Sequence, residues 1–154
     1  MKLYHGTTSI FQIPDLQKAR HNTDFGPGFY VTDKYALAND WLNNKPGKRI
    51  NYYEVTLSQL TTCNLSIKIF KKANIEWAKF IYNNRHNKVK KIQYALVIGP
   101  IADNGLANWF QKIDKKEITW DELATKIKFN RYKSKQFCFL NSDSLKLLKY
   151  VGCK

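Results

Sequence analysis

The sequence predicts one domain of mixed α-helical and β-strand structure. Short segments in which apolar and polar residues alternate, as in strands, lie between segments whose apolar residues recur at helical spacing. The 154 residues are 44% hydrophobic and 14% aromatic, which suffices for a buried core. No repeat, low-complexity stretch or linker interrupts residues 1–154, so we expect a single domain.

The expected strands are bounded by glycine, proline or polar residues. They span residues 3–4, 29–31, 49–57, 65–69, 94–98 and 136–140. The run from Tyr94 to Ile98 is almost continuously apolar, which indicates a buried strand. We expect His5 to end the first strand and residues 136–140 to form the last one.

The expected helices alternate with these strands. They span residues 35–42, 73–84, 106–113 and 120–127, with a short final helix capped by Ser142 or Asp143. In the first of them, the stripe expected to face the core consists of Tyr35, Ala38, Trp41 and Leu42. Thr119 and Glu122 have the spacing of a capping box, in which each side chain binds the other residue's backbone N–H.

The net charge of +14 is the strongest signal in the composition. Such a charge attracts polyanions, so it suggests a nucleic acid or an acidic protein as partner; alternatively, the lysines are simply solvated. Residues 68–91 are the most basic part of the chain. Trp77, Tyr82 and His86 lie among these charges, either as in proteins that bind single strands or as core aromatics under a basic surface.

Several classes of protein are disfavoured by the sequence. No apolar run is long enough to span a bilayer, and the N-terminus lacks the apolar core of a signal peptide, so we expect a cytoplasmic location with no membrane partner. Cys63, Cys138 and Cys153 are odd in number and widely spaced. They suggest neither a disulfide framework nor a zinc site, and we expect no metal.

Residues 22–32 combine a polar entry, a glycine-rich turn and the start of an aromatic strand. Gly26 and Gly28 permit backbone angles and close approaches that a Cβ atom would prevent. Tyr30 follows this turn within the predicted strand, where its ring could meet a flat ligand. The alternative interpretation is an ordinary turn that leads into a core strand.

Three further polar residues are candidates for a site. His5 lies beside Gly6 at a strand end, where the imidazole is open to a ligand, although a lone histidine is often structural. Arg20 precedes the glycine turn and either contacts a phosphate or is simply exposed. Asp103 follows a central strand, as site residues often do, or belongs to a turn.

Three fragments together resemble the ADP-ribosyltransferase superfamily in its His–Tyr–Glu branch. They are Tyr4-His5-Gly6-Thr7, Gly28-Phe29-Tyr30-Val31-Thr32 and Gln136-Phe137-Cys138-Phe139. The chain looks most like an uncharacterised bacterial family of ADP-ribosyltransferase-like toxins. It shares with that family residues 3–7, 24–30, 84–85 and 99–103. The resemblance implies an α+β fold: a split β-sandwich of two small antiparallel sheets, with helices around an NAD cleft.

The resemblance also implies roles for individual residues. His5 would bind a ribose hydroxyl of NAD, Gly6 the nicotinamide amide through its backbone, and Tyr30 would stack on the nicotinamide ring. The residues expected to bind NAD are His5, Gly6, Thr7, Arg20, Asp24, Gly28 and Tyr30. The residues expected to be catalytic are His5, Tyr30, Gln136 and Asp103.

The chain departs from the pattern of the superfamily at the position of the catalytic glutamate, where it has Gln136. A glutamine can orient a ribose hydroxyl, but it supplies no negative charge to a cationic transition state. Asp24 and Asp103 are the candidates for a substitute carboxylate. A second departure is Ala95, where relatives are expected to carry an acidic residue.

The function implied is that of an NAD-dependent mono-ADP-ribosyltransferase, the toxin of a bacterial toxin–antitoxin pair. NAD would be its co-substrate, a protein or nucleic acid its acceptor, and an antitoxin protein a possible partner. The alternative is a catalytically degenerate module of the same fold that binds nucleic acid or a partner protein. An RNA 2′-phosphotransferase fits less well, because Thr7 stands where that activity would require a basic residue.

Overall fold

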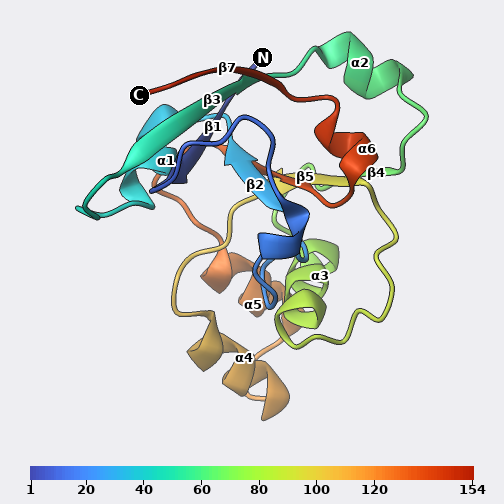
Figure 1. Ribbon diagram of the computed structural model, residues 1–154. Helices are drawn as coiled ribbons and strands as arrows, with labels where there is room; N and C mark the ends of the chain where they lie inside the picture. The colour runs from blue at the N-terminus through green and yellow to red at the C-terminus, as the bar shows by residue number, and fades with distance from the viewer.

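The computed structural model describes residues 1–154 and confirms an α+β fold (Figure 1). The strands are β1 (Lys2–Thr7), β2 (Phe29–Thr32), β3 (Arg49–Glu54), β4 (Ile67–Ile69), β5 (Leu96–Pro100), β6 (Lys135–Phe139) and β7 (Lys149–Cys153). The helices are α1 (Tyr35–Asp40), α2 (Leu57–Thr62), α3 (Ile75–Arg85), α4 (Leu106–Asp114), α5 (Trp120–Ile127) and α6 (Ser142–Leu145), with a 3-10 turn, η1, at Leu16–Lys18.

The strands form one sheet in the order β4-β5-β6-β2-β1-β3-β7. Only β4 and β5 run parallel to each other. β1 pairs with β3 along its whole length, but it meets β2 at a single residue pair, Tyr4 with Thr32. The two separate sheets expected from the resemblance are thus two portions of one sheet, joined at this narrow contact between β1 and β2.

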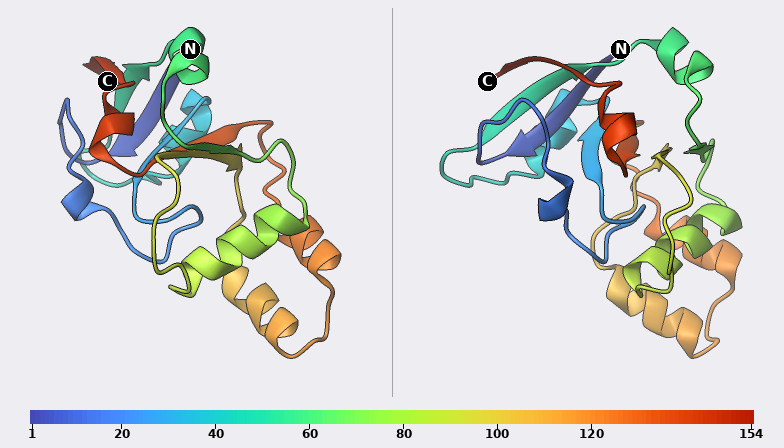
Figure 2. Two further views of the ribbon diagram at one scale, coloured as in Figure 1. Left: turned by 90° about the vertical axis from the view of Figure 1, so that its right-hand side faces the viewer. Right: turned by 45° about the vertical axis from the view of Figure 1, so that its right-hand side comes forward.

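Each face of the sheet has its own core, because successive residues of a strand point to opposite faces. On one face, Val97 and Cys138 pack against α3, α4 and α5 in what we call the first core. On the other face, Phe29 and Phe137 belong to the second core, against which Phe11 and residues of α6 also pack. Figure 2 shows α3, α4 and α5 together on one side of the sheet, with α4 farthest from it.

Most of the expected elements are present, but an additional strand, β7, and the end of β3 differ from expectation. β7 follows the strand that was expected to be last, and it pairs with the outer edge of β3. β3 ends at Glu54, and Leu57, expected within that strand, begins α2 with 63% of its surface exposed. The α2 and β7 segments carry no long apolar periodicity, so the pattern did not reveal them.

Helix ends are partly as expected. Thr119 and Glu122 form the predicted capping box of α5. The final helix is capped by Asn141 rather than by Ser142 or Asp143. On the stripe of α1, Ala38 and, just after the helix, Leu42 are buried as expected, but Tyr35 and Trp41 are exposed and Leu37 is buried as well. The helix is short, so its approach to β1 rather than its apolar periodicity decides which side is buried.

Two glycines are required by close packing between elements. A Cβ atom on Gly6 would lie 2.4 Å from the Ala38 carbonyl oxygen, because α1 crosses directly over β1. A Cβ atom on Gly28 would lie 2.6 Å from both the Cys138 Sγ and the Phe139 carbonyl oxygen on β6. Both glycines therefore have a structural role that does not depend on a ligand.

We expect the substitution Gly6→Ala to destabilise the protein by about 1–3 kcal/mol, the usual cost of overpacking a core. Urea unfolding followed by circular dichroism measures this loss. Gly47→Ala is the matched control, because its Cβ atom would meet nothing within 4 Å and only the positive φ of 72° opposes the change. An equal or smaller loss for Gly6→Ala would contradict the packing role.

Candidate functional site

The hydroxyl group of Tyr30 holds the glycine turn together. It donates a hydrogen bond to the Gly26 carbonyl oxygen at 2.8 Å and accepts one from the Phe25 N–H at 2.9 Å. The Thr23 hydroxyl donates to the same Gly26 carbonyl at 2.6 Å. Burial raises the pKa of Tyr30 well above its usual value, so the hydroxyl stays protonated and able to donate. The Tyr30 hydroxyl therefore fixes the backbone of the turn at Phe25 and at Gly26.

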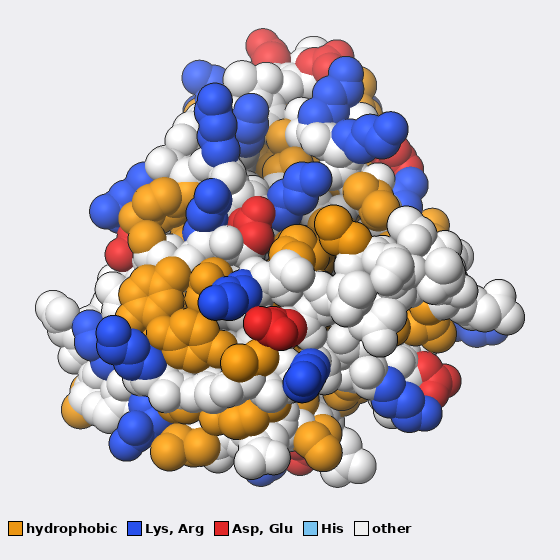
Figure 3. Space-filling model, turned by 90° about the horizontal axis from the view of Figure 1, so that it is seen from above, with side chains coloured by type: hydrophobic (Ala, Val, Ile, Leu, Met, Phe, Trp, Pro, Cys, Tyr) orange, Lys and Arg blue, Asp and Glu red, His pale blue; other side chains and the backbone are white.

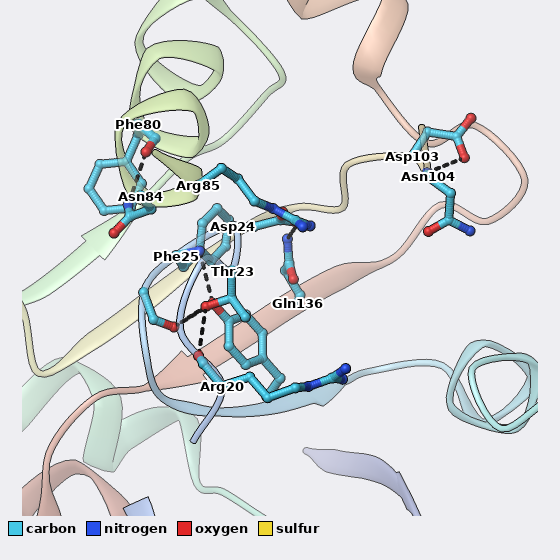
Figure 4. A network of polar contacts seen from close by, with 12 residues as sticks. Arg20, Thr23, Asp24, Phe25, Phe80, Asn84, Arg85, Asp103, Asn104 and Gln136 are labelled. Carbon is cyan, nitrogen blue, oxygen red and sulfur yellow. Dashed lines mark hydrogen bonds and ion pairs between the residues drawn. The ribbon is translucent and has the colours of Figure 1, made fainter. Parts of the chain in front are cut away.

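This turn presents Asp24, whose carboxylate is almost completely buried, with 7% of the residue exposed. Arg85, at the end of α3, donates to Oδ1 of Asp24 from Nε at 2.8 Å and from Nη2 at 2.5 Å. Gln136 of β6 donates from Nε2 to Oδ2 at 3.1 Å. Figure 4 shows Arg85, Asp24 and Gln136 pointing toward one another from three different parts of the chain.

Gln136 suits its position because its amide nitrogen faces only acceptors. Nε2 contacts Oδ2 of Asp24 and also the Pro100 carbonyl oxygen at 3.3 Å. A glutamate at this position would turn a carboxylate oxygen toward both acceptors and would repel Asp24. Oε1 of Gln136 makes no hydrogen bond within the protein, so it is the atom left for a ligand. The departure from the glutamate pattern is thus matched by the surroundings.

His5 is also held by the backbone of β2. Its Nδ1 lies 2.7 Å from the Tyr30 carbonyl oxygen, which can only accept, so Nδ1 carries the proton. Burial lowers the pKa of His5, and the bond to Tyr30 opposes this only in part. The imidazole is therefore neutral at pH 7, and Nε2 presents a lone pair that can accept a hydrogen bond from a hydroxyl group.

His5 and Tyr30 are joined by the hydrogen bond from the His5 ring to the Tyr30 carbonyl oxygen, and their two rings lie on opposite sides of β2. The imidazole packs against Phe29, with ring centroids 4.5 Å apart, and against Phe11 at 5.7 Å, on the side of the second core. The half-buried Tyr30 ring packs on the side of the first core. The backbone of β2 lies between the two rings, and Asp24 and Gln136 share the side of Tyr30.

The other residues expected in the site are Thr7, Arg20 and Asp103. The Thr7 hydroxyl accepts a hydrogen bond from the Ser9 N–H. Arg20 is exposed, and its carbonyl oxygen accepts from the Thr23 hydroxyl at 3.4 Å. Asp103 is exposed and binds the N–H of its neighbour Asn104, apart from the Asp24 group in Figure 4. Of the two candidate carboxylates, Asp24 is therefore the one that contacts Gln136.

Arg85 is the site residue to which the sequence alone assigned no role. A buried carboxylate requires a partner, which is the signal that points to a cation for Asp24. Arg85 could not be chosen from the sequence among 26 lysines and arginines, because 61 residues separate it from Asp24. Ala95 is buried next to Ser66, whose carbonyl oxygen accepts from the Ala95 N–H.

Other features of the structure bear on which ligands the protein can hold. No group of three His, Cys, Asp or Glu side chains is arranged to hold a metal ion. None of the helices combines the length and the hydrophobicity that a membrane span requires. Two open hollows lie away from His5 and Tyr30: one over α4, lined by residues from Gly105 to Glu117, and one beside β7.

We expect Gln136→Glu to destabilise the protein by about 3 kcal/mol at pH 8, the scale of an uncompensated buried charge. The surroundings raise the pKa of the new carboxyl above its unfolded value, so the loss is fully present at high pH and shrinks as the pH falls toward 4. Urea unfolding at several pH values measures this change.

Gln136→Met is the matched control for that substitution, because it removes both hydrogen bonds without adding a charge. Its loss, about 1–3 kcal/mol, should not depend on pH. Asp24→Asn should lessen the cost of Gln136→Glu, because an asparagine can donate to the new carboxylate. A Gln136→Glu protein as stable as the wild type at pH 8 would show that the two acceptors do not select an amide here.

The lowered pKa of His5 should make stability depend on pH. The folded protein binds the proton more weakly than the unfolded chain, so the free energy of unfolding should decrease as the pH falls below about 6.5. This part of the decrease should be absent in His5→Asn. Nitrogen-15 NMR should also show Nδ1–H as the tautomer at pH 7. A His5 that titrates above 6.5 would refute the assignment.

The chain matches a known protein family. The model of a family described as a protein of unknown function, DUF3990, matches residues 1–150. No curated protein matches the chain. The family match includes β1, β2, the Asp24 turn, Arg85 and β6, so it covers every residue of the candidate site. Since the match extends over nearly the whole sequence, the chain belongs to the DUF3990 family.

Proposed function

We propose that the protein is an NAD-dependent mono-ADP-ribosyltransferase that transfers ADP-ribose to a macromolecular acceptor. The observation that carries the proposal is the order of three strands. β1 with His5, β2 with Tyr30 and β6 with Gln136 are consecutive neighbours in the sheet. Tyr4, Thr32 and Gln136 are paired in register across them, although more than 100 residues separate β2 from β6.

The side chains on these strands suit parts of NAD. Nε2 of His5 and Oε1 of Gln136 are acceptors without a protein partner, as ribose hydroxyls require. Because the two side chains lie on opposite sides of β2, each would contact a different ribose of NAD in this proposal. Arg20 and the partly exposed Arg85 supply positive charge for the pyrophosphate. The Tyr30 hydroxyl is already engaged by the turn, so in this proposal only the exposed part of its ring stacks on the nicotinamide.

In the proposed reaction the bond between the nicotinamide nitrogen and the ribose breaks, and its electron pair neutralises the pyridinium ring. Positive charge develops on the ribose, which negative charge nearby would stabilise. An acceptor lone pair then forms the new bond to the ribose carbon, and the acceptor loses a proton. Asp24 takes the role of the anionic group, with Gln136 orienting a hydroxyl.

The ion pair with Arg85 offsets the charge of Asp24, so we expect a low rate of transfer. The same observation favours a second candidate function, a module of this family that binds nucleic acid or a partner protein without catalysis. The resemblance adds to the proposal that the transferase is the toxin of a toxin–antitoxin pair, whose partner would be an antitoxin protein. Binding of NAD separates the two candidates, since only the transferase requires it.

We expect incubation with adenylate-labelled NAD and a bacterial lysate to transfer label to protein or nucleic acid. His5→Ala and Asp24→Asn should each lower the transfer at least tenfold, because each removes a group proposed to contact the ribose or its charge. Gel autoradiography after nuclease or protease treatment measures the transfer and identifies the class of acceptor.

Lys45→Gln is a matched control, because Lys45 lies exposed in the loop after α1 and should leave the transfer unchanged. Thermal melting establishes that each variant is folded. Absence of both label transfer and NAD binding in the folded wild-type protein would exclude the transferase and leave the binding module.

A further inference from the structure

The positive charge of the protein is concentrated in one part of the chain. Residues 68–135 contain 16 of the 26 lysines and arginines but six of the 12 acidic residues, so they carry +10 of the net +14. This segment includes α3, α4 and α5. The opposite end of the molecule, seen from above in Figure 3, also shows lysines and arginines scattered among hydrophobic patches. Charge alone therefore does not locate a binding site.

Two of the three aromatic residues that the sequence placed among the charges, Trp77 and Tyr82, are not available to a ligand, whereas His86 is exposed. Trp77 is completely buried, and its indole N–H donates to the Pro100 carbonyl oxygen. Tyr82 is 9% exposed and is covered by the ring of His86, with centroids 4.1 Å apart. Both belong to the first core, which supports the interpretation of core aromatics under a basic surface.

Trp109 of α4 differs from these residues. It is half-buried at the margin of the first core, and it lines the hollow over α4. The ammonium groups of Lys112 and Lys126 lie 4.7 Å and 5.6 Å from the centre of an indole ring. Both lysines are exposed and flexible, so a ligand can displace them from the ring without opening the core.

The rest of the hollow is polar. Its other lining residues are Gly105, Asn108, Gln111, Lys112, Lys115 and Glu117. A flat ring in a hollow with lysines beside it matches a nucleotide, whose base stacks on an aromatic ring while its phosphate contacts ammonium groups. An acidic peptide would use the lysines but would gain nothing specific from the indole face. The amides of Asn108 and Gln111 add donors and acceptors for a base edge.

We propose that the hollow around Trp109, with Lys112, Lys115 and Lys126, binds single-stranded nucleic acid. A base stacks on the indole and the flanking phosphates contact the three lysines. The hollow begins at Gly105, five residues after Pro100, whose carbonyl oxygen contacts Gln136. Five extended residues span at most about 18 Å, so a short strand bound here reaches the candidate site. The binding itself does not depend on the proposed transfer chemistry.

The experiment measures fluorescence anisotropy of a labelled 12-nucleotide single-stranded RNA, without NAD, at several salt concentrations. Trp109→Ala should weaken binding about tenfold, the scale of one stacked base, and Trp109→Phe should restore most of it. The double variant Lys112→Gln and Lys126→Gln should weaken binding and reduce the slope of log affinity against log salt by about 1 to 2.

The matched control is Lys45→Gln with Lys48→Gln, which removes the same charge from an exposed loop and should change the salt slope less. Because the assay contains no NAD, its outcome does not depend on the proposed transferase. Thermal melting checks folding, and the lysine variants do not touch the core. Unchanged binding by Trp109→Ala, or equal competition by polyglutamate, would overturn the proposal in favour of charge alone or an acidic protein.

Discussion

The carbonyl oxygen of Gly26 is the point on which the candidate site depends. Three side chains from two segments converge on it: the hydroxyls of Thr23 and Tyr30 and, at 3.8 Å, the thiol of Cys138. This fixes a turn whose glycine has a φ of 107°, a conformation that other residues rarely adopt. The turn in turn determines where the Asp24 carboxylate lies. Tyr30 is thus first a positioning residue for Asp24, whatever else its ring contacts.

Asp24 connects the turn to α3 and β6. A buried carboxylate is tolerated only when its oxygens are paired, and Arg85 and Gln136 divide this task between Oδ1 and Oδ2. The pairing explains why an amide suits position 136 in this chain. The negative charge of Asp24 and the positive charge of Arg85 cancel, so the centre of the site is nearly neutral in a protein whose net charge is +14.

Much of the fold was predictable where local patterns are strong. The apolar run that became β5 and the capping box at Thr119 follow from short-range chemistry, and both are present. β7 was missed because pairing with the outer edge of β3 requires no apolar periodicity of its own. The ion pair between Arg85 and Asp24 joins residues far apart in the chain. The direction in which the Trp109 side chain points depends on tertiary packing. Neither can be predicted from the spacing of residues in the sequence.

The single residue pair between β1 and β2 has a mechanical consequence. Because one backbone pair contributes little resistance to shear, side-chain packing must hold the two portions together: the second core contains Leu3 and Tyr53 from one portion and Phe29 and Val31 from the other. The bond from His5 to the Tyr30 carbonyl also crosses this seam. A substitution in the second core at this seam would therefore loosen the two portions of the sheet from each other as well as leave a cavity.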